Sequence, residues 1–401
     1  MSPPRFLNRH TPPHIATLVL MTGIGALSMN IFLPSLPGMA RDFGVDYSVM
    51  QLSVSAYLAV CAAAQLVIGP LSDRIGRRPM ILGGLSVFLL ATLGTLLAPT
   101  AGVFLAFRMM QAAVVTGIVL SRAVVRDMVP GPQAASMIGY VTMGMSLAPM
   151  LGPIAGGALD DAFGWRANFV ALGIAGLLVL ALVWADLGET GKPGEGGGSL
   201  PLRNWLELLA SRRFWGYALA ATASSGGFFA YVGGAPFVGA EVFHLSPSAV
   251  GYYFAAPAIG YAFGNLLSGR YSVRSGMERM VLAGAVVSTL ALVAALALDL
   301  AGISHPLIFF PLVGVMALGN GMLLPNANAG MMSVRPELAG TASGLGGTMT
   351  IGGGAALAAL AGALLSAERG ATPLLALMLA ASAGSIPAIL WVMRRRASLA
   401  L

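Results

Sequence analysis

Long apolar runs, separated by short charged segments, dominate this chain. Hydrophobic residues make up 57% of it and charged residues only 9%, against about 25% charged in a soluble domain. So few charges could not cover the surface of a soluble protein of 401 residues. A bilayer is crossed by roughly 20 apolar residues. We therefore expect an all-α membrane protein with twelve transmembrane helices, near residues 14–37, 47–71, 79–98, 101–125, 133–159, 163–185, 214–239, 247–270, 279–300, 306–332, 338–366 and 371–393.

A polar, glycine-rich stretch divides these runs into two sets of six. Residues 191–199 read Gly-Lys-Pro-Gly-Glu-Gly-Gly-Gly-Ser, and an amphipathic segment follows at 202–209, as in a flexible linker with a short interfacial helix. Three residues of the first set recur 200 positions later in the second set, as Gly269, Arg274 and Gly276. We predict two pseudo-symmetric six-helix bundles, residues 1–187 and 213–401, joined by a cytosolic linker at 188–212.

The distribution of basic residues predicts the orientation in the membrane. With the N-terminus in the cytosol, 18 of the 22 Lys and Arg residues fall in cytosolic segments and 3 in outer loops, while Arg108 lies within a span. Cytosolic segments of membrane proteins are enriched in Lys and Arg. We therefore expect a multi-pass protein with both termini cytosolic. The formal charge of +7 then needs no nucleic acid partner, since the basic residues lie near anionic lipid.

The most specific motif follows the second run and reads Gly-Pro-Leu-Ser-Asp-Arg-Ile-Gly-Arg-Arg-Pro over residues 69–79. Its glycines permit close helix approach and a tight turn. Asp73 can pair with arginines or cap a helix, which would make a breakable contact at the cytosolic face. The general bias toward basic cytosolic residues explains Arg77 and Arg78 but not the whole pattern. We call this predicted contact the cytosolic latch. It comprises Gly69, Asp73, Arg74, Gly76, Arg77, Arg78, Arg126 and Asp127.

This motif resembles the signature G-x-x-x-D-R-x-G-R-R between helices 2 and 3 of the major facilitator superfamily. The resemblance implies the fold of that superfamily, with alternating access between two bundles. In the second half Val273 replaces the acid, so a strong latch is expected only in the first half.

The fourth run carries an intramembrane arginine in the segment Arg108-Met-Met-Gln111-Ala112. It resembles the R-x-x-Q-G motif of proton-coupled members of the superfamily, with Ala112 in place of glycine. An arginine inside a membrane is costly and therefore marks a functional site by default. We predict that Arg108 and Gln111 couple substrate or proton binding to the conformational change. A structural arginine that hydrogen-bonds the carbonyls of a broken helix is the alternative.

The fifth run resembles the antiporter signature G-P-x-x-G-G of the superfamily. Prolines remove backbone donors and kink helices, and small residues allow tight helix packing. In the superfamily this signature accompanies export by antiport, while generic small-residue packing is the alternative here. The residues concerned are Pro149, Gly152, Pro153, Gly156 and Gly157.

Three further segments resemble the bicyclomycin/chloramphenicol-resistance (Bcr/CflA) branch: residues 30–37, 122–127 and 230–238. The resemblance covers nearly the whole chain. It implies a proton-driven exporter of small hydrophobic drugs in the bacterial inner membrane, working as a monomer. The alternative is metabolite uptake, or facilitated transport without proton coupling.

One departure from that branch concerns the proton. The branch usually has an acid just before residues 33–37, where this chain has the neutral Asn30. No acid lies deep within any of the runs. A proton antiporter needs a group that titrates with conformation, usually a buried carboxylate. Either Asp127, Asp160 or Asp161 titrates at a vestibule edge, or coupling is weak or absent. The neutral Asn30 favours neutral or zwitterionic substrates.

Polar and aromatic side chains within the runs are candidates for lining a substrate cavity, although packing or interhelical hydrogen bonds would also explain each. They include Asn30, Tyr57, Gln65, Tyr231, Phe237, Asn265, Asn320 and Asn326. We expect no metal or cofactor, because Cys61 is the single cysteine and the four histidines lie at loops or run ends. Convergent catalytic groups are likewise not apparent, so we do not expect an enzyme.

Overall fold

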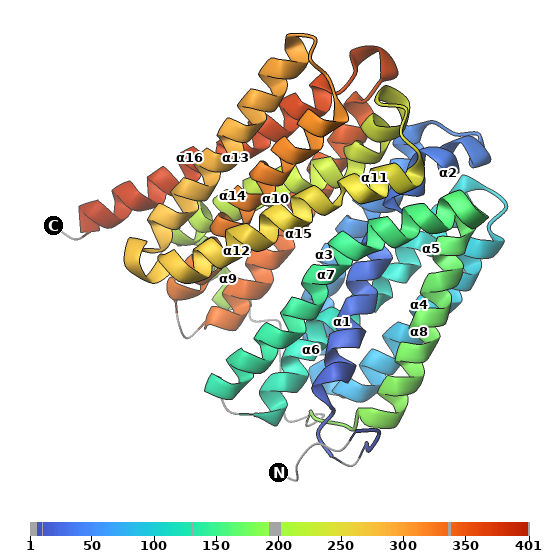
Figure 1. The fold of residues 1–401 in the computed structure, drawn as a ribbon. Helices are drawn as coiled ribbons and strands as arrows, with labels where there is room; N and C mark the ends of the chain where they lie inside the picture. The colour runs from blue at the N-terminus through green and yellow to red at the C-terminus, as the bar shows by residue number, and fades with distance from the viewer. Residues whose placement is uncertain (1–5, 10, 130, 192–201, 336–337, 400–401) are drawn as a thin grey trace.

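A computed structural model describes residues 6–9, 11–129, 131–191, 202–335 and 338–399. The regular secondary structure in this part of the chain is all helical, with no strand, as the sequence predicts (Figure 1). Every predicted run coincides with one helix or with consecutive helical pieces.

The first six runs form the N-terminal half. Pro34 and Pro37 cannot donate backbone hydrogen bonds, and the first run accordingly splits into three pieces. The fourth run also splits, at a 3-10 turn that begins at Gln111. The helical pieces of this half are α1 (Ile15–Asn30), η1 (Leu33–Ser35), α2 (Leu36–Phe43), α3 (Tyr47–Ile75), α4 (Arg77–Leu97), α5 (Ala101–Met110), η2 (Gln111–Val114), α6 (Val115–Met128), α7 (Gly131–Phe163) and α8 (Arg166–Asp186).

The C-terminal half follows a short helix in the predicted linker region. That helix, α9 (Leu202–Leu209), buries Leu208 in the core of the C-terminal half. The hydroxyls of Ser211 and Ser246 cap two of the later helices. The pieces are α10 (Arg212–Phe237), a π-helical turn η3 (Val238–Val242), α11 (Pro247–Tyr253), α12 (Ala255–Ser275), α13 (Met277–Leu300), α14 (Pro306–Ser333), α15 (Ala339–Leu364), η5 (Ala367–Arg369) and α16 (Thr372–Leu399).

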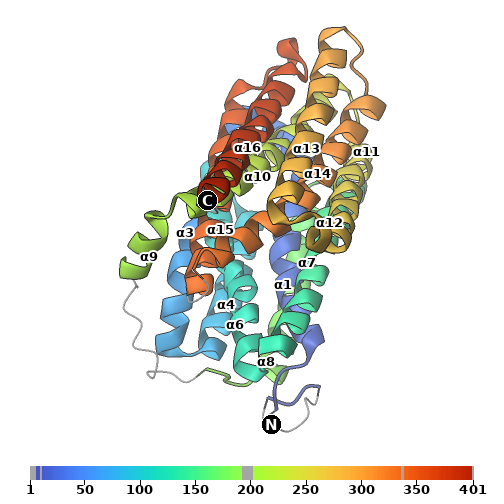
Figure 2. The ribbon, with the colours of Figure 1, turned by 90° about the vertical axis from the view of Figure 1, so that its left-hand side faces the viewer.

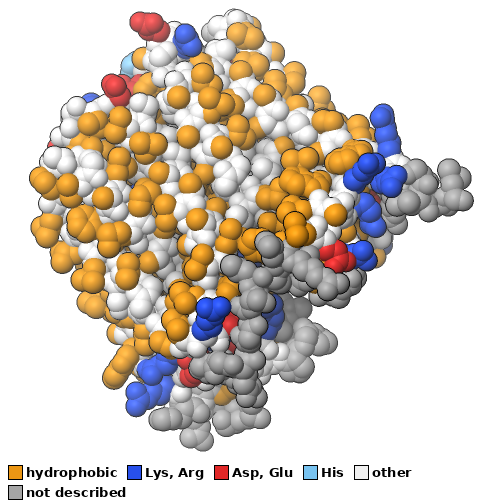
Figure 3. Space-filling model, turned by 180° about the vertical axis from the view of Figure 1, so that it is seen from behind, with side chains coloured by type: hydrophobic (Ala, Val, Ile, Leu, Met, Phe, Trp, Pro, Cys, Tyr) orange, Lys and Arg blue, Asp and Glu red, His pale blue; other side chains and the backbone are white. Residues whose placement is uncertain are grey.

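The helices have the dimensions and surface of membrane spans. Nine helical segments within the described residues are long and apolar enough to cross a bilayer. The predicted runs at 133–159, 214–239 and 247–270 are also helical but are not among these nine. Hydrophobic side chains cover the middle of the face in Figure 3, and charged side chains gather toward its ends. The surface is therefore suited to contact with lipid.

The two halves repeat the same turn. α3 ends at Ile75 and α4 begins at Arg77, and α12 ends at Ser275 and α13 begins at Met277. The glycines between them, Gly76 and Gly276, have φ of 102° and 83°, values that favour glycine. The predicted echo between the halves is thus a real repeat of backbone geometry.

The halves meet at the end opposite the latch (Figures 1 and 2). We call this the outer end, because the sequence predicts the latch to be cytosolic. The Tyr47 hydroxyl donates to the Gly233 carbonyl at 2.6 Å, and the Gln51 amide donates to the Ala358 carbonyl at 2.5 Å. Arg41 also pairs with Glu241 at 2.6 Å. Every hydrogen bond between the halves that the described residues show lies toward this end.

Candidate functional site

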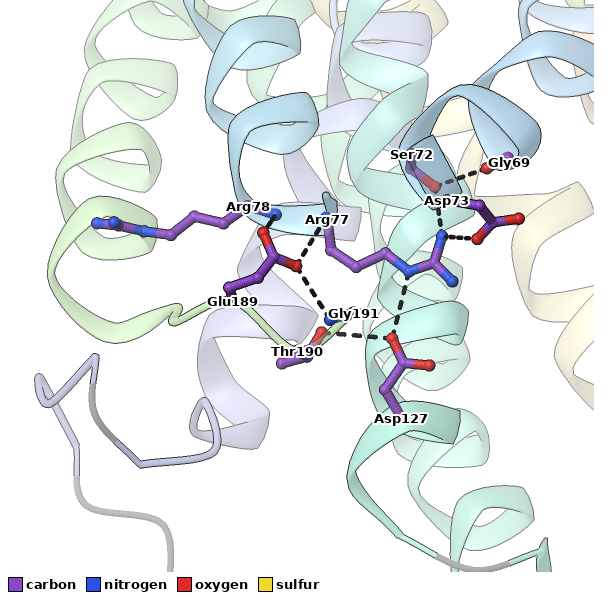
Figure 4. A network of polar contacts seen from close by, with 9 residues as sticks. All are labelled: Gly69, Ser72, Asp73, Arg77, Arg78, Asp127, Glu189, Thr190 and Gly191. Carbon is purple, nitrogen blue, oxygen red and sulfur yellow. Dashed lines mark hydrogen bonds and ion pairs between the residues drawn. The ribbon is translucent and has the colours of Figure 1, made fainter. Parts of the chain in front are cut away.

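Arg77 is the centre of the predicted cytosolic latch (Figure 4). Its Nη1 lies 2.6 Å from Oδ1 of Asp73, and its Nε lies 3.2 Å from Oδ2 of Asp127. The guanidinium also donates to the Ser72 hydroxyl. Only 14% of the Arg77 side chain is exposed, so these charge-assisted bonds are partly shielded from water. Arg77 therefore ties together the end of α3, the start of α4 and the end of α6.

Glu189 completes the latch, although the sequence did not predict it as a member. Its carboxylate accepts the backbone N–H groups of Arg77 at 2.8 Å and Arg78 at 3.1 Å, which are unpaired donors in the first turn of α4. It also accepts the N–H of Gly191 at 3.0 Å. A Cβ at Gly76 would lie 2.5 Å from Glu189 Oε2. Gly76 is thus required both by its positive φ and by the approach of Glu189.

Other predicted latch residues lie outside this network. Arg74 and Arg126 are exposed, and neither makes a hydrogen bond or ion pair that the described residues show. A Cβ at Gly69 would meet nothing within 4 Å, so the close helix approach predicted there is absent in this conformation. The Arg78 side chain turns away from Arg77 and donates to the Trp184 carbonyl at 2.9 Å (Figure 4). The latch partners that the described residues show lie in the N-terminal half or, as Glu189 does, in the linker.

Arg108 is fully buried in the N-terminal half. It donates to the carbonyls of Ser53 at 3.2 Å and Ser28 at 3.0 Å, and to Gln111 Oε1 at 2.7 Å. Its guanidinium carbon lies 3.9 Å from the centre of the Tyr57 ring and 4.5 Å from that of Phe32. Neutral carbonyls and aromatic faces therefore surround this cation.

No ion pair of Arg108 with an acid is seen in the described part of the chain, and two of its acceptors are backbone carbonyls of different helices, α1 and α3. The Asn30 amide donates at 2.7 Å to the Ala26 carbonyl, within its own helix. Gln111 passes the network on to α4, because its amide donates to the Thr92 hydroxyl at 2.8 Å. Arg108 thus joins α1, α3 and the break between α5 and η2.

The glycines of the antiporter-like motif lie where α7 crosses other helices. A side chain at Gly156 would overlap the Ile31 carbonyl of the first run, and at Gly152 a Cβ would lie 3.3 Å from the Cβ of Asn30. Gly157 faces the other half, where a Cβ would overlap the Pro247 carbonyl of α11. In return, a Cβ at Gly251 of α11 would overlap the Pro153 carbonyl. We name this reciprocal contact between the halves the outer crossing.

A carboxylate closes the same crossing. Asp161, near the end of α7, accepts the backbone N–H of Ser248 at 3.2 Å. Ser248 lies in the first turn of α11, where an acid is favoured by the free N–H groups and the helix dipole. The bond joins the two halves. The bond between Asp161 and Ser248 would therefore break if the outer crossing opened.

The residues predicted to line a cavity fall into two groups. Asn320 accepts from Ser224 at 2.6 Å, and Asn326 donates to Ser268 at 2.8 Å, so both make interhelical hydrogen bonds inside the C-terminal half. Asn30 and Tyr57 are buried in the N-terminal half, where Tyr57 packs against Arg108 and Asn30 lies next to Gly152. In contrast, the Phe237 ring lies 5.0 Å from that of Tyr47 across the halves. Gln65 Oε1 would lie 3.7 Å from a Cβ at Gly347, also across the halves.

Tyr231 occupies an aromatic cluster of the C-terminal half. It is fully buried, and its ring centroid lies 5.0 Å from that of Phe254 and 6.5 Å from those of Phe309 and Phe310. Its hydroxyl is buried and has no hydrogen-bond partner among the described residues, which is costly in an apolar setting. Asn265 is half-buried on α12.

Comparison with known proteins identifies the fold and its family. Residues 18–359 and 240–400 match the sequence model of the family described as Major Facilitator Superfamily. The chain belongs to the major facilitator superfamily. The resemblance drawn from residues 69–79 is thereby confirmed, and this is a family of membrane transporters rather than of enzymes.

Several relatives in the major facilitator superfamily have names that refer to drug resistance. The chain is 31% identical over 363 residues to Multidrug resistance protein D of Escherichia coli, covering 89% of this chain and 90% of that protein. It is 30% identical to the Bicyclomycin resistance protein homolog of Haemophilus influenzae, covering 86% and 88%. A Chloramphenicol resistance protein of Pseudomonas aeruginosa is 33% identical, covering 67% and 65%.

A solved structure agrees with the fold expected for the superfamily. A bacterial homolog to the human lysosomal transporter Spinster, in an inward-facing and occupied conformation, superposes with a TM-score of 0.73 at 18% identity. The match covers 94% of this chain and 95% of the other. At this identity the likeness establishes the common fold.

Proposed function

We propose that this chain exports small hydrophobic or amphipathic compounds by alternating access, as a proton antiporter. The observation that carries the proposal is the outer crossing. The glycine-rich motif of α7 packs against α11 of the other half at Gly157 and Gly251, and relatives with drug-resistance names cover most of the chain. Two bundles that rock about a central site need such contacts, made in one state and broken in the other.

The contacts between the halves support an assignment of the conformation. The outer end is held by the crossing, by Asp161 and by the Arg41–Glu241 pair. We assign this conformation as inward-facing and place both termini in the cytosol, in keeping with the bias of basic residues. In the opposite state the cytosolic ends would approach each other. The open surface at Gly69 would then receive a helix of the C-terminal half, and Arg77 would hold the receiving surface rigid.

Asp161 is the acid that we propose for linking protons to this motion. As a carboxylate it caps α11 across the halves. The negative charge of Asp161 stabilises this cap, so its removal would weaken the contact that closes the outer end. The other charged contact at this end is the Arg41–Glu241 pair, which is exposed on both sides and is correspondingly weak.

Arg108 has a different role in this proposal. It binds the carbonyls of Ser28 in α1 and Ser53 in α3, and the side chain of Gln111 in η2. Movement of one of these three elements would therefore displace the other two. We infer that it couples the position of α1 to that of α3 and α5 as substrate arrives. We further propose that the substrates are small neutral or zwitterionic compounds and that the transporter works as a monomer.

The experiment that tests export is accumulation of labelled chloramphenicol in pump-deficient cells that express the chain, with and without a protonophore. Proton-driven export predicts low accumulation that rises with the protonophore and in Arg108→Ala. Low accumulation that ignores the protonophore would leave export standing and remove proton coupling. Accumulation equal to that of the empty vector would exclude chloramphenicol as a substrate. Counterflow in vesicles would then test the alternative of metabolite uptake.

A further inference from the structure

Arg78 belongs to the signature motif, yet it takes no part in the contacts of Arg77 with Asp73 and Asp127. Its side chain extends along the outside of the N-terminal half toward α8 (Figure 4). Nη2 donates to the Trp184 carbonyl at 2.9 Å, whereas Nη1 makes no hydrogen bond that the described residues show. A cation held in this position still has hydrogen-bonding capacity to offer to an anion.

A groove of about 360 Å³ begins next to this arginine, between α4 and α8. Leu82 and Ser86 follow Arg78 at intervals of four residues and therefore share its face of α4. The Trp184 side chain lines the groove while its carbonyl binds Arg78. The complete lining is Leu82, Ser86, Leu177, Leu180, Ala181 and Trp184.

The groove opens on the periphery of the molecule. α4 and α8 lie on the side of the N-terminal half that faces away from the C-terminal half (Figure 1). Leu177 and Trp184 are each 60% exposed, although the family is embedded in lipid. A tryptophan with one apolar and one polar side is typical of the membrane interface.

The charge around the groove is positive. The nearby acid Glu189 is engaged by backbone N–H groups of α4. Asp186 is fully buried and accepts bonds from Leu7, His14 and Thr17 at 2.6 to 2.8 Å. An anionic headgroup would therefore meet the Arg78 guanidinium rather than a free carboxylate.

We propose that this site binds one anionic phospholipid of the leaflet on the latch side. Its phosphate would accept a hydrogen bond from Nη1 of Arg78, and one acyl chain would lie along the groove between α4 and α8. This inference does not depend on the direction of transport or on the identity of the drug.

Native mass spectrometry of the purified chain, titrated with phosphatidylglycerol or phosphatidylcholine of the same acyl chains, tests the site. We expect the wild type to prefer phosphatidylglycerol. Arg78→Gln should weaken phosphatidylglycerol binding by about fivefold, the effect of one basic residue near an anionic headgroup, and weaken binding of the zwitterionic phosphatidylcholine less. Ala181→Trp should fill the groove and weaken both. The matched controls, Arg270→Gln and Leu290→Trp, are exposed residues of the C-terminal half and should bind as the wild type does.

A photoactivatable group on the acyl chain of phosphatidylglycerol gives a second readout in the unaltered protein. Crosslinks should map to peptides of α4 and α8. Equal phosphatidylglycerol affinity in wild type and Arg78→Gln would overturn the proposal. So would crosslinks spread evenly around both halves, and this result decides the matter even if a variant fails to fold.

Discussion

At the scale of single residues, a buried cation without an acid is the most demanding feature of the chain. Arg108 is completely buried and donates to two backbone carbonyls and one amide oxygen. A charged residue at the centre of a membrane helix costs about 3 kcal/mol on insertion. These hydrogen bonds and the ring of Tyr57 at 3.9 Å offset that cost. The geometry depends on the planar fork of the guanidinium.

We therefore expect Arg108→Lys to fail although it retains the charge. A lysine ammonium cannot reach Ser28, Ser53 and Gln111 together, and each charge-assisted hydrogen bond is worth about 1.5–3 kcal/mol. Transport should fall by about tenfold or more, and the apparent melting temperature in detergent should drop. Wild-type transport in Arg108→Lys would show that only the positive charge matters.

Glu189 offers a second test at this scale. Because it caps the start of α4, Glu189→Ala should destabilise the protein by about 0.5–2 kcal/mol, as loss of a helix cap does. Thermal unfolding in detergent measures this. Glu368→Ala, an exposed acid in η5 at the outer end, is the matched control. An equal melting temperature in the two variants would argue against the cap.

At the scale of helices, close crossings decide which state is stable. Gly157 of α7 and Gly251 of α11 let two backbones touch across the halves. Since a methyl group at either position would overlap a carbonyl oxygen, the cost falls on the closed outer end alone. Overpacking of this kind typically costs about 1–3 kcal/mol.

Gly157→Ala and Gly251→Ala should each shift the population toward an open outer end, by about tenfold. A cysteine placed at Ser248, in a chain that carries Cys61→Ser, would report this through faster labelling by a membrane-impermeant maleimide. Gly83→Ala is the control, because a Cβ there meets nothing within 4 Å. If the glycine variants label no faster than Gly83→Ala, the outer crossing does not hold this end closed.

The helices were largely predictable from the sequence, and several partnerships were not. The run at 79–98 became α4 at Arg77–Leu97, and that at 47–71 became α3 at Tyr47–Ile75, because apolarity and turn residues act locally. Glu189 escaped prediction, since 112 residues separate it from Arg77 and no local pattern marks it. The outward turn of Arg78 also depends on α8. Asn320 is polar within a run, as a lining residue would be, yet its partners are neighbouring helices.

At the scale of the whole molecule, alternating access requires that the outer end and the latch end are not closed at the same time. The outer end is closed by bonds between the halves, whereas the bonds of the latch residues seen in the described ranges join only the N-terminal half and the linker. Asp161 belongs to the first end and Asp127 to the second. Export against a gradient requires that motion between the two states be linked to proton movement.

The direct test of this link is proton movement in proteoliposomes that contain a pH-sensitive dye. When chloramphenicol flows down its gradient through the wild type, protons should move the opposite way and change the internal pH. Asp161→Asn should still carry chloramphenicol but lose that pH change. Chloramphenicol flux through the wild type without any pH change would contradict proton antiport.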